Sequence, residues 1–149
     1  MQVIPADRLQ LAVLASGRGS NFDALCQAIE RGDLNADIQV LVGDKENAPA
    51  LDKARKRNIE AVYLNPRSYS KRDEYEGDLV KLLKDQQVTV VALAGYMRLV
   101  GPVLLKYFQH RIVNIHPALL PAFPGLQAQQ QAVDYGVRYS GCTVHIVDA

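Results

Sequence analysis

The chain has 149 residues, of which 48% are hydrophobic and 22% are charged. This length corresponds to one domain that can bury a hydrophobic core. The 17 Lys and Arg residues nearly balance the 16 Asp and Glu residues, and the net charge is +1. That balance argues against a nucleic-acid-binding protein that relies on a broad basic surface.

The sequence shows no membrane or secretion signal. Its longest apolar stretch, 88–97, is about half of the ~20 residues that a membrane-spanning helix needs. The first residues have neither the basic nor the apolar region of a signal peptide. Cys26 and Cys142 form neither a disulfide framework nor a zinc-ligand set. We therefore expect a soluble, cytoplasmic protein with a single domain over residues 1–149, no metal, and neither nucleic acid nor membrane as a partner.

The first half of the chain alternates between short apolar runs typical of strands and stretches with the apolar spacing of helices. Apolar residues at 22, 25, 26 and 29 form one helical stripe, and Gly32 ends that helix. The other elements expected here are strands at 9–15, 38–42 and 61–64 and a helix at 47–57 that packs through Leu51 and Ala54.

The second half continues the alternation. Ser70, with Asp73 three residues later, predicts the capped start of a long helix whose inner face includes Tyr75 and Leu79. Residues 88–94 are apolar and rich in valine, which is typical of a central parallel strand covered on both faces. The remaining expected elements are a short helix from 101, a strand at 111–115, a Pro-rich loop, a helix at 126–135 and a strand at 142–147.

This alternation predicts an α/β fold. Strands that alternate with helices form a Rossmann-like, mostly parallel sheet with helices on both faces. In such sheets ligands bind beyond the carboxyl ends of the strands, near the point where the strand order reverses. The candidate functional residues are therefore those that directly follow each strand.

A Gly-rich loop at 16–21 follows the first strand and leads into a helix, where free N–H groups and the helix dipole favour an anion. Gly17 and Gly19 allow close approach of a phosphate, and Ser20 and Asn21 can cap the helix or donate. The loop fails the dinucleotide fingerprint, because Phe22 occupies the third glycine position and no suitable acidic residue clearly ends the second strand. It also lacks the Gly-Lys-Ser/Thr of a P-loop. A phosphate site and a plain Gly-rich turn with a Ser/Asn cap both remain open.

Asn114 and His116 lie two residues apart at the end of the fifth predicted strand and so share one side of it. An amide and an imidazole placed together can stabilise an oxyanion and transfer a proton. Neither Ser20 nor Cys142 stands beside a visible base, so covalent catalysis is unsupported. A histidine whose hydrogen bonds are satisfied by backbone is the structural alternative.

Four collinear motifs carry a family resemblance from Leu9 to the last residue. The segment NIHPALLPAFPG resembles the NxHPSLLPxxxG signature of the folate-dependent formyltransferases, a family that includes methionyl-tRNA formyltransferase and formyltetrahydrofolate deformylase. Together with ASGRGSNFDAL, AGYMRLV and GCTVHIVDA, it is similar to the phosphoribosylglycinamide formyltransferases of that family. The resemblance implies the formyltransferase fold. It also implies formyl transfer from 10-formyltetrahydrofolate, the co-substrate, to the amine of 5-phosphoribosylglycinamide in purine synthesis.

The resemblance also implies roles for individual residues. Gly19, Ser20 and Asn21 match the loop that holds the substrate phosphate. Asn114 matches the residue that holds the formyl oxygen and contacts the folate, and His116 matches the residue that transfers the proton.

Further residues match the folate site of the family. Arg72 matches a folate-contacting arginine, although by itself it indicates only an exposed first-turn residue. Met97, Arg98, Leu99 and Val100 match the segment that lines the pterin pocket. Taken alone, this segment indicates ordinary packing at a strand end and a surface charge.

The chain departs from the family pattern in two places. Residues 126–131 lack the histidines or arginine that the family often has there. The family's catalytic aspartate falls in a GxDxGP-like segment beyond Ala149, and Asp148 matches the acid that precedes this segment. We therefore expect a formyltransferase fold that lacks its C-terminal part. If no residues follow, the 149-residue form should turn over little.

Two alternatives to formyl transfer stay open: a formyltetrahydrofolate deformylase that uses water, and a catalytically silent binding module. By resemblance we also expect a cis peptide bond between Leu120 and Pro121. The oligomeric state is not predicted.

Overall fold

The computed structural model describes residues 8–116, 122–139 and 141–148. In chain order its elements are β1 (Leu9–Ala15), α1 (Ser20–Glu30), β2 (Ala36–Gly43), α2 (Pro49–Lys56), β3 (Glu60–Tyr63), the 3-10 helix η1 (Pro66–Ser68), α3 (Arg72–Asp85), β4 (Val90–Leu93), α4 (Pro102–Tyr107), β5 (Ile112–His116), α5 (Ala128–Tyr135) and β6 (Thr143–Ile146).

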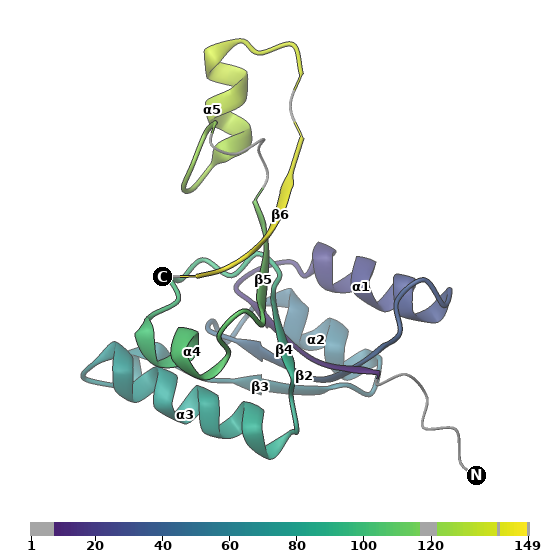
Figure 1. Cartoon of the computed structure of the whole chain (residues 1–149), viewed down its shortest axis with the longest axis vertical. Coiled ribbons are helices and arrows are strands. Elements are labelled where there is room, and N and C mark those ends of the chain that lie inside the picture. The colour runs from purple at the N-terminus through teal and green to yellow at the C-terminus, as the bar shows by residue number, and fades with distance from the viewer. Residues whose placement is uncertain (1–7, 117–121, 140, 149) are drawn as a thin grey trace.

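The strands form one six-stranded sheet in the order β3-β2-β1-β4-β5-β6. All neighbouring pairs are parallel except β5 and β6, which are antiparallel. Figure 1 shows helices on both faces of the sheet. This arrangement confirms the predicted α/β fold with a mostly parallel sheet.

The strand order reverses between β1 and β4, which lie side by side at the centre of the sheet. Successive strands run outward from β1 to β3 on one side and from β4 to β6 on the other. The carboxyl ends of β1 and β4 therefore flank the position where ligands bind in this class of fold. The Gly-rich loop follows β1, and the segment matched to the pterin pocket follows β4.

The sheet face under α1 and α2 is packed with apolar side chains, several of them alanines. Phe22 and Cys26 of α1 and Leu51 of α2 are buried against the β1 and β2 residues Val13 and Leu41. Gly43 approaches Leu51 closely, because a Cβ there would lie 3.1 Å from its Cδ2 atom. This face shows the close helix-to-sheet packing that buried parallel strands require.

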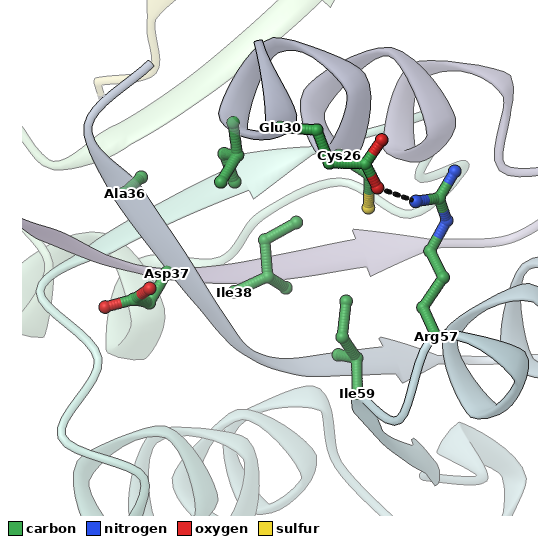
Figure 2. A pocket seen from close by; sticks show the side chains of 8 residues that line it. Cys26, Glu30, Ala36, Asp37, Ile38, Arg57 and Ile59 are labelled. Atoms are coloured by element: carbon green, nitrogen blue, oxygen red, sulfur yellow. Dashed lines mark hydrogen bonds and ion pairs between the residues drawn. The ribbon is translucent and has the colours of Figure 1, made fainter. Parts of the chain in front are cut away.

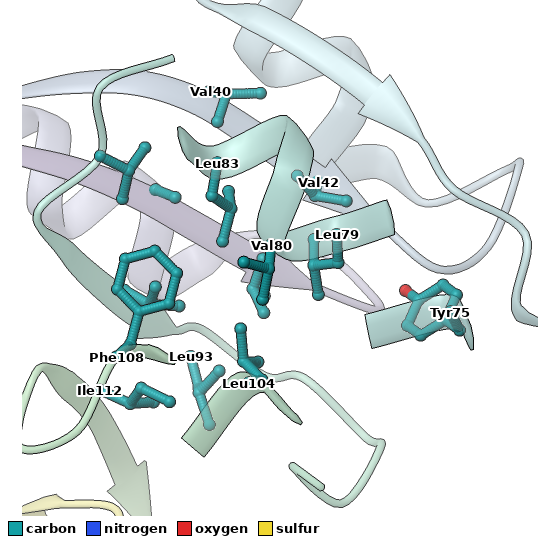
Figure 3. Close-up of a cluster of buried hydrophobic side chains, with 14 residues drawn as sticks. Val40, Val42, Tyr75, Leu79, Val80, Leu83, Leu93, Leu104, Phe108 and Ile112 are labelled. Carbon is teal, nitrogen blue, oxygen red and sulfur yellow. The ribbon is translucent and has the colours of Figure 1, made fainter. Parts of the chain in front are cut away.

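The opposite face is covered by α3 and α4 and holds the larger cluster (Figure 3). Leu79 and Leu83 project from α3, and Leu104 and Phe108 come from α4 and the residue that follows it. Each of these four side chains is at most 1% exposed. The apolar residues of β1 and β2 alternate between the two clusters, as expected for strands covered on both faces.

Some predicted helix starts differ from the structure. The long helix α3 begins at Arg72, and its N-cap Lys71 makes no side-chain capping bond, so the predicted capped start at Ser70 is wrong. The preceding residues instead form η1, a turn that was not predicted, in which the Asn65 side chain accepts from the Arg67 amide. Helix α2 begins at Pro49, two residues after its predicted start at 47. Proline suits the first helical position because it has no N–H to leave unpaired.

At the far end of the chain, β5 and β6 lead away from the helical layers towards α5, which stands apart in Figure 1. Part of the predicted Pro-rich loop between residues 115 and 126, namely 117–121, lies outside the described residues, and so does the predicted cis bond between Leu120 and Pro121. Within the described part of the chain, no helix is both long and apolar enough to cross a membrane.

Candidate functional site

The Gly-rich loop is shaped by backbone contacts with α2. Gly19 is the N-cap of α1 and has a left-handed conformation with φ 77°. A Cβ at Gly19 would lie 2.9 Å from the Cβ of Ala50, so only glycine fits. The Ala50 amide also donates to the carbonyl of Gly17 at 3.1 Å. These contacts hold the loop against the first turn of α2.

The N-cap of α1 is Gly19, so neither Ser20 nor Asn21 holds the cap position of the structural alternative, and no side-chain capping bond is found there among the described residues. The first helical amides, beginning at Ser20 and Asn21, have no acceptor within the helix. Ser20 is exposed and Asn21 is half-buried. Asp23 in the first turn is paired with Lys53 at 2.6 Å, which offsets its negative charge near this end of the helix. The geometry is therefore suited to an anion.

The segment 97–100 follows β4 and leaves its apolar side chains open to solvent. Met97 is 55% exposed and Leu99 is 84% exposed, so they do not make the ordinary packing contacts that the residues alone indicated. Arg98 is half-buried, and its guanidinium lies 5.4 Å from the ring centre of Tyr75, a cation–π contact that a plain surface charge would not make. Val100 packs against the α3/α4 cluster.

A pair of tyrosines, Tyr75 and Tyr96, lies next to segment 97–100, and Arg98 contacts the ring of Tyr75. The hydroxyl groups of Tyr75 and Tyr96 lie 3.3 Å apart. Burial is the main cause that raises the pKa of Tyr75 and of Tyr96 above the usual tyrosine range. Both hydroxyls therefore remain protonated and available as hydrogen-bond donors near neutral pH.

Arg72 and the residues after segment 97–100 come together along α4. Arg72 is exposed, as expected for a first-turn residue, and it lines a cavity of about 410 Å³ together with Val100 and Leu105. Gly101 packs so closely that a Cβ there would lie 2.6 Å from the Nε atom of Arg72. The structure thus brings together Arg72 and Val100, two residues matched to the folate site from separate parts of the sequence.

Glu76 is a buried carboxylate that the sequence analysis missed. It is 3% exposed, and its oxygens accept from the amides of Gly101 at 2.6 Å and Leu104 at 3.3 Å. These amides begin α4, so a side chain of α3 caps the neighbouring helix. The bond to the Gly101 amide also fixes the backbone just after segment 97–100.

Asn114 lies on β5 beside Leu93 of β4 and opposite His145 of β6. Its Nδ2 atom is 3.4 Å from Nε2 of His145. Because an amide nitrogen can only donate, Asn114 is the donor in this contact. The sequence analysis did not single out His145.

His116 is the last residue of β5 and pairs in register with Thr143. Its backbone position is therefore at the carboxyl end of β5, two residues beyond Asn114. The position of its side chain lies outside the described structure. Its catalytic role remains a prediction.

One expectation about the Gly-rich loop is wrong. Asp44 directly follows β2 and is 8% exposed, so an acidic residue does end the second strand. Its Oδ1 atom is buried and has no hydrogen-bond partner among the described residues. The dinucleotide fingerprint still fails, because Phe22 at the third glycine position is fully buried in the α1/α2 cluster.

Another cavity, of about 370 Å³, lies between α1, α2 and the start of β2 (Figure 2). Cys26, Ile38 and Ile59 line it, and Glu30 and Arg57 form an ion pair of 2.6 Å beside it. It lies towards the amino end of β2, away from the edge where this fold class binds ligands. Among the described residues, no group of three or more potential metal ligands is present.

Comparison with known proteins decides the family. The model of the family described as formyl transferase matches residues 9–149 of this chain. The chain belongs to the formyl transferase family. Its matched region contains the Gly-rich loop, segment 97–100 and Asn114 at neighbouring strand ends.

Similar members of this family are known from sequence and structure. The chain is 42% identical to the phosphoribosylglycinamide formyltransferase of Bacillus subtilis over 93% of this chain and 71% of that protein. It matches a crystal structure of glycinamide ribonucleotide transformylase 1 from Geobacillus kaustophilus with a TM-score of 0.93 and 45% identity, over 96% of this chain and 76% of that one. It is also 35% identical to the human trifunctional purine biosynthetic protein adenosine-3, of which it spans 14%.

Proposed function

We propose that this protein transfers a formyl group from 10-formyltetrahydrofolate to the amine of 5-phosphoribosylglycinamide, a step of purine synthesis in the cytoplasm. One observation carries the proposal: in a chain of the formyl transferase family, a Gly-rich loop follows β1, an exposed apolar segment follows β4, and the amide donor Asn114 lies near the carboxyl end of the neighbouring β5, all at one edge of the sheet.

In this proposal Gly19, Ser20 and Asn21 bind the substrate phosphate. The free amides at the start of α1 point to this position, and the helix dipole favours negative charge there. The ion pair of Asp23 with Lys53 keeps the nearby carboxylate from opposing the anion. Binding through backbone amides explains why the loop needs glycine more than it needs a basic side chain.

The folate occupies the side of the site formed by segment 97–100 and Arg72. Met97 and Leu99 offer exposed apolar surface, which suits the flat ring of a pterin. The guanidinium of Arg72 lines the adjoining cavity and can pair with a carboxylate of the folate. Arg98 lies on the ring of Tyr75, a contact that restricts its position.

The chemistry joins the substrate amine to the formyl carbon and breaks the bond from that carbon to the folate nitrogen. Asn114 donates to the formyl oxygen as negative charge develops on it. Asn114 has two amide N–H groups, so it can bond His145 and donate to the formyl oxygen at the same time. His116 moves the proton from the attacking amine towards the departing nitrogen.

A transfer assay tests the proposal. The purified protein is mixed with 10-formyltetrahydrofolate labelled in the formyl group and with either 5-phosphoribosylglycinamide or the same amine without phosphate. We expect the label to move to the phosphorylated amine, with a strong preference over the unphosphorylated one. Release of labelled formate at a rate independent of the amine would instead identify a deformylase. Binding of both ligands without transfer or release would identify a silent binding module.

A further inference from the structure

Ser16 links the Gly-rich loop after β1 to the segment after β4 through hydrogen bonds. It directly follows β1 and is 4% exposed. Its amide donates to the carbonyl of Gly95 at 3.2 Å, and its Oγ atom accepts from the amide of Met97 at 2.9 Å. The preceding bond between these strands runs from the Ala94 amide to the Leu14 carbonyl at 2.9 Å. The hydroxyl therefore extends the β1–β4 ladder by one further hydrogen bond.

A side chain is needed at this point because both backbones turn away from each other. Gly95 has a φ of 69°, a left-handed conformation that redirects the chain after β4. On the other strand the carbonyl of Gly17 accepts from Ala50 of α2. The Ser16 hydroxyl supplies the acceptor that the amide of Met97 needs at this divergence.

Segment 97–100 is consequently held at its two ends. Ser16 fixes its first amide, and Glu76 accepts from the Gly101 amide just after its last residue. Between these points Met97 and Leu99 remain exposed. Ser16 is the first residue of the Gly-rich loop, so loop and segment leave the sheet from one bonded position.

We propose that Ser16 is a positioning residue that holds the folate-facing segment 97–100 in register with the phosphate-binding residues 19–21. This inference rests on the proposed function, because it assigns one substrate to each side of the bond. Formyl transfer needs the reacting atoms of the two substrates about 3–3.5 Å apart, so the relative position of the two segments controls the reaction. In this proposal Ser16 acts through the amide of Met97 and not through contact with a substrate.

The test compares Ser16→Ala with Thr89→Ala. Thr89 makes the same type of bond at the opposite end of the same strand pair, where its Oγ1 atom accepts from the Gln10 amide at 3.1 Å. Both substitutions remove one hydroxyl acceptor from the β1–β4 pair, but only Ser16 adjoins the site. Ser16→Thr keeps the hydroxyl and serves as the conservative variant.

The measurements are the affinity for 10-formyltetrahydrofolate, titrated with and without 5-phosphoribosylglycinamide, and the urea midpoint of each variant. We expect Ser16→Ala to weaken folate binding about tenfold, because the Met97 amide loses its acceptor. Thr89→Ala should change this affinity less than about twofold despite a lower urea midpoint, and Ser16→Thr should restore wild-type affinity. If Ser16→Ala does not fold, Ser16→Cys, with a similar size and a weaker acceptor, replaces it with the same expected order.

Equal folate affinity in Ser16→Ala and Thr89→Ala would overturn the inference and leave Ser16 a purely structural residue. The proposed function would survive that outcome, because the wild-type protein would still bind both ligands. A wild-type protein that binds neither ligand would overturn the proposed function and this inference together.

Discussion

The two faces of the sheet bury different kinds of side chain. Under α1 and α2 the buried cluster is apolar apart from the thiol of Cys26. On the α3/α4 side, the buried polar side chains of the described residues are Ser16, Asp44 and Glu76. Ser16 and Asp44 continue the rows of Leu14 and Val42, which face α3, beyond the strand ends.

Buried polar groups destabilise a protein unless they are hydrogen-bonded, so their concentration on one face needs a reason. Ser16 and Glu76 each hold one end of the exposed segment 97–100. The α1/α2 face fixes its own loop by close contact of Gly19 with Ala50 instead. One face thus shapes its part of the site through side-chain hydrogen bonds, and the other through packing of backbone and small residues.

The largest expected effect concerns the amide donor on the α3/α4 side. Asn114→Ala should lower the formyl-transfer rate by about 10²–10³-fold, because one donor to the developing oxyanion is lost. Asn47→Ala, a change at an exposed residue before α2, is the matched control and should have no effect. Steady-state transfer kinetics measure both variants. A decrease of less than about threefold in Asn114→Ala would remove Asn114 from the reacting site.

Substitutions on the two faces should lower the free energy of unfolding by different amounts. Glu76→Ala should lower the free energy of unfolding by about 2–4 kcal/mol, because two buried amides lose a charged acceptor. Cys26→Ala on the other face should lower it by only about 1 kcal/mol, since it removes one buried sulfur atom. Urea unfolding gives both values. Equal losses would contradict the distinction between a bonded and a packed face.

Phosphate binding depends on the loop that the α1/α2 face supports. Asn21→Asp should weaken binding of 5-phosphoribosylglycinamide about tenfold or more, because it places negative charge beside the phosphate. Asn47→Asp introduces the same charge at an exposed position and should leave the affinity unchanged. Calorimetric titration measures both. Wild-type affinity in Asn21→Asp would contradict the assignment of the loop.

The tyrosine pair should make stability depend on pH in the alkaline range. Burial raises the pKa of Tyr96 in the folded protein, while the unfolded chain keeps the usual tyrosine pKa of about 10. Below this pH both states hold the proton; above it the unfolded state releases the proton first, so stability falls as pH rises. Tyr96→Phe should make this decline shallower. If the unfolding free energy of Tyr96→Phe falls with pH above about 10 as steeply as that of the wild type, the buried hydroxyl of Tyr96 is not the cause of the decline.

Local patterns in the sequence predicted most of the fold. Apolar runs and helical spacing gave the strands and helices to within a few residues, and Gly32 ends its helix with a φ of 81°. The start predicted at Ser70 failed because a capping pattern is only a local preference, and here η1 and the packing of Tyr75 set where α3 begins. The Gly-rich loop and Asn114 were also recognisable, since each directly follows or ends a strand.

The residues that hydrogen-bond to the site residues, Ser16, Glu76 and His145, could not be predicted in the same way. Ser16 meets Met97 across 81 positions, and Glu76 meets Gly101 across 25. His145 reaches Asn114 only because β6 runs antiparallel to β5, a direction that its short apolar pattern does not encode. Each contact depends on strand order and register, which arise from the assembled sheet and not from neighbouring residues.

The central claim is that both substrates bind at the carboxyl edge of the sheet, between the Gly-rich loop and segment 97–100. Mapping of amide signals by NMR tests it most directly, because the two cavities of similar volume lie in different regions. We predict that 5-phosphoribosylglycinamide shifts the amides of 19–21 and that 10-formyltetrahydrofolate shifts those of 97–101. The amides of Cys26, Ile38 and Ile59, which line the cavity in Figure 2, should stay unchanged. Shifts centred on these three residues, with none at 19–21 or 97–101, would contradict the account.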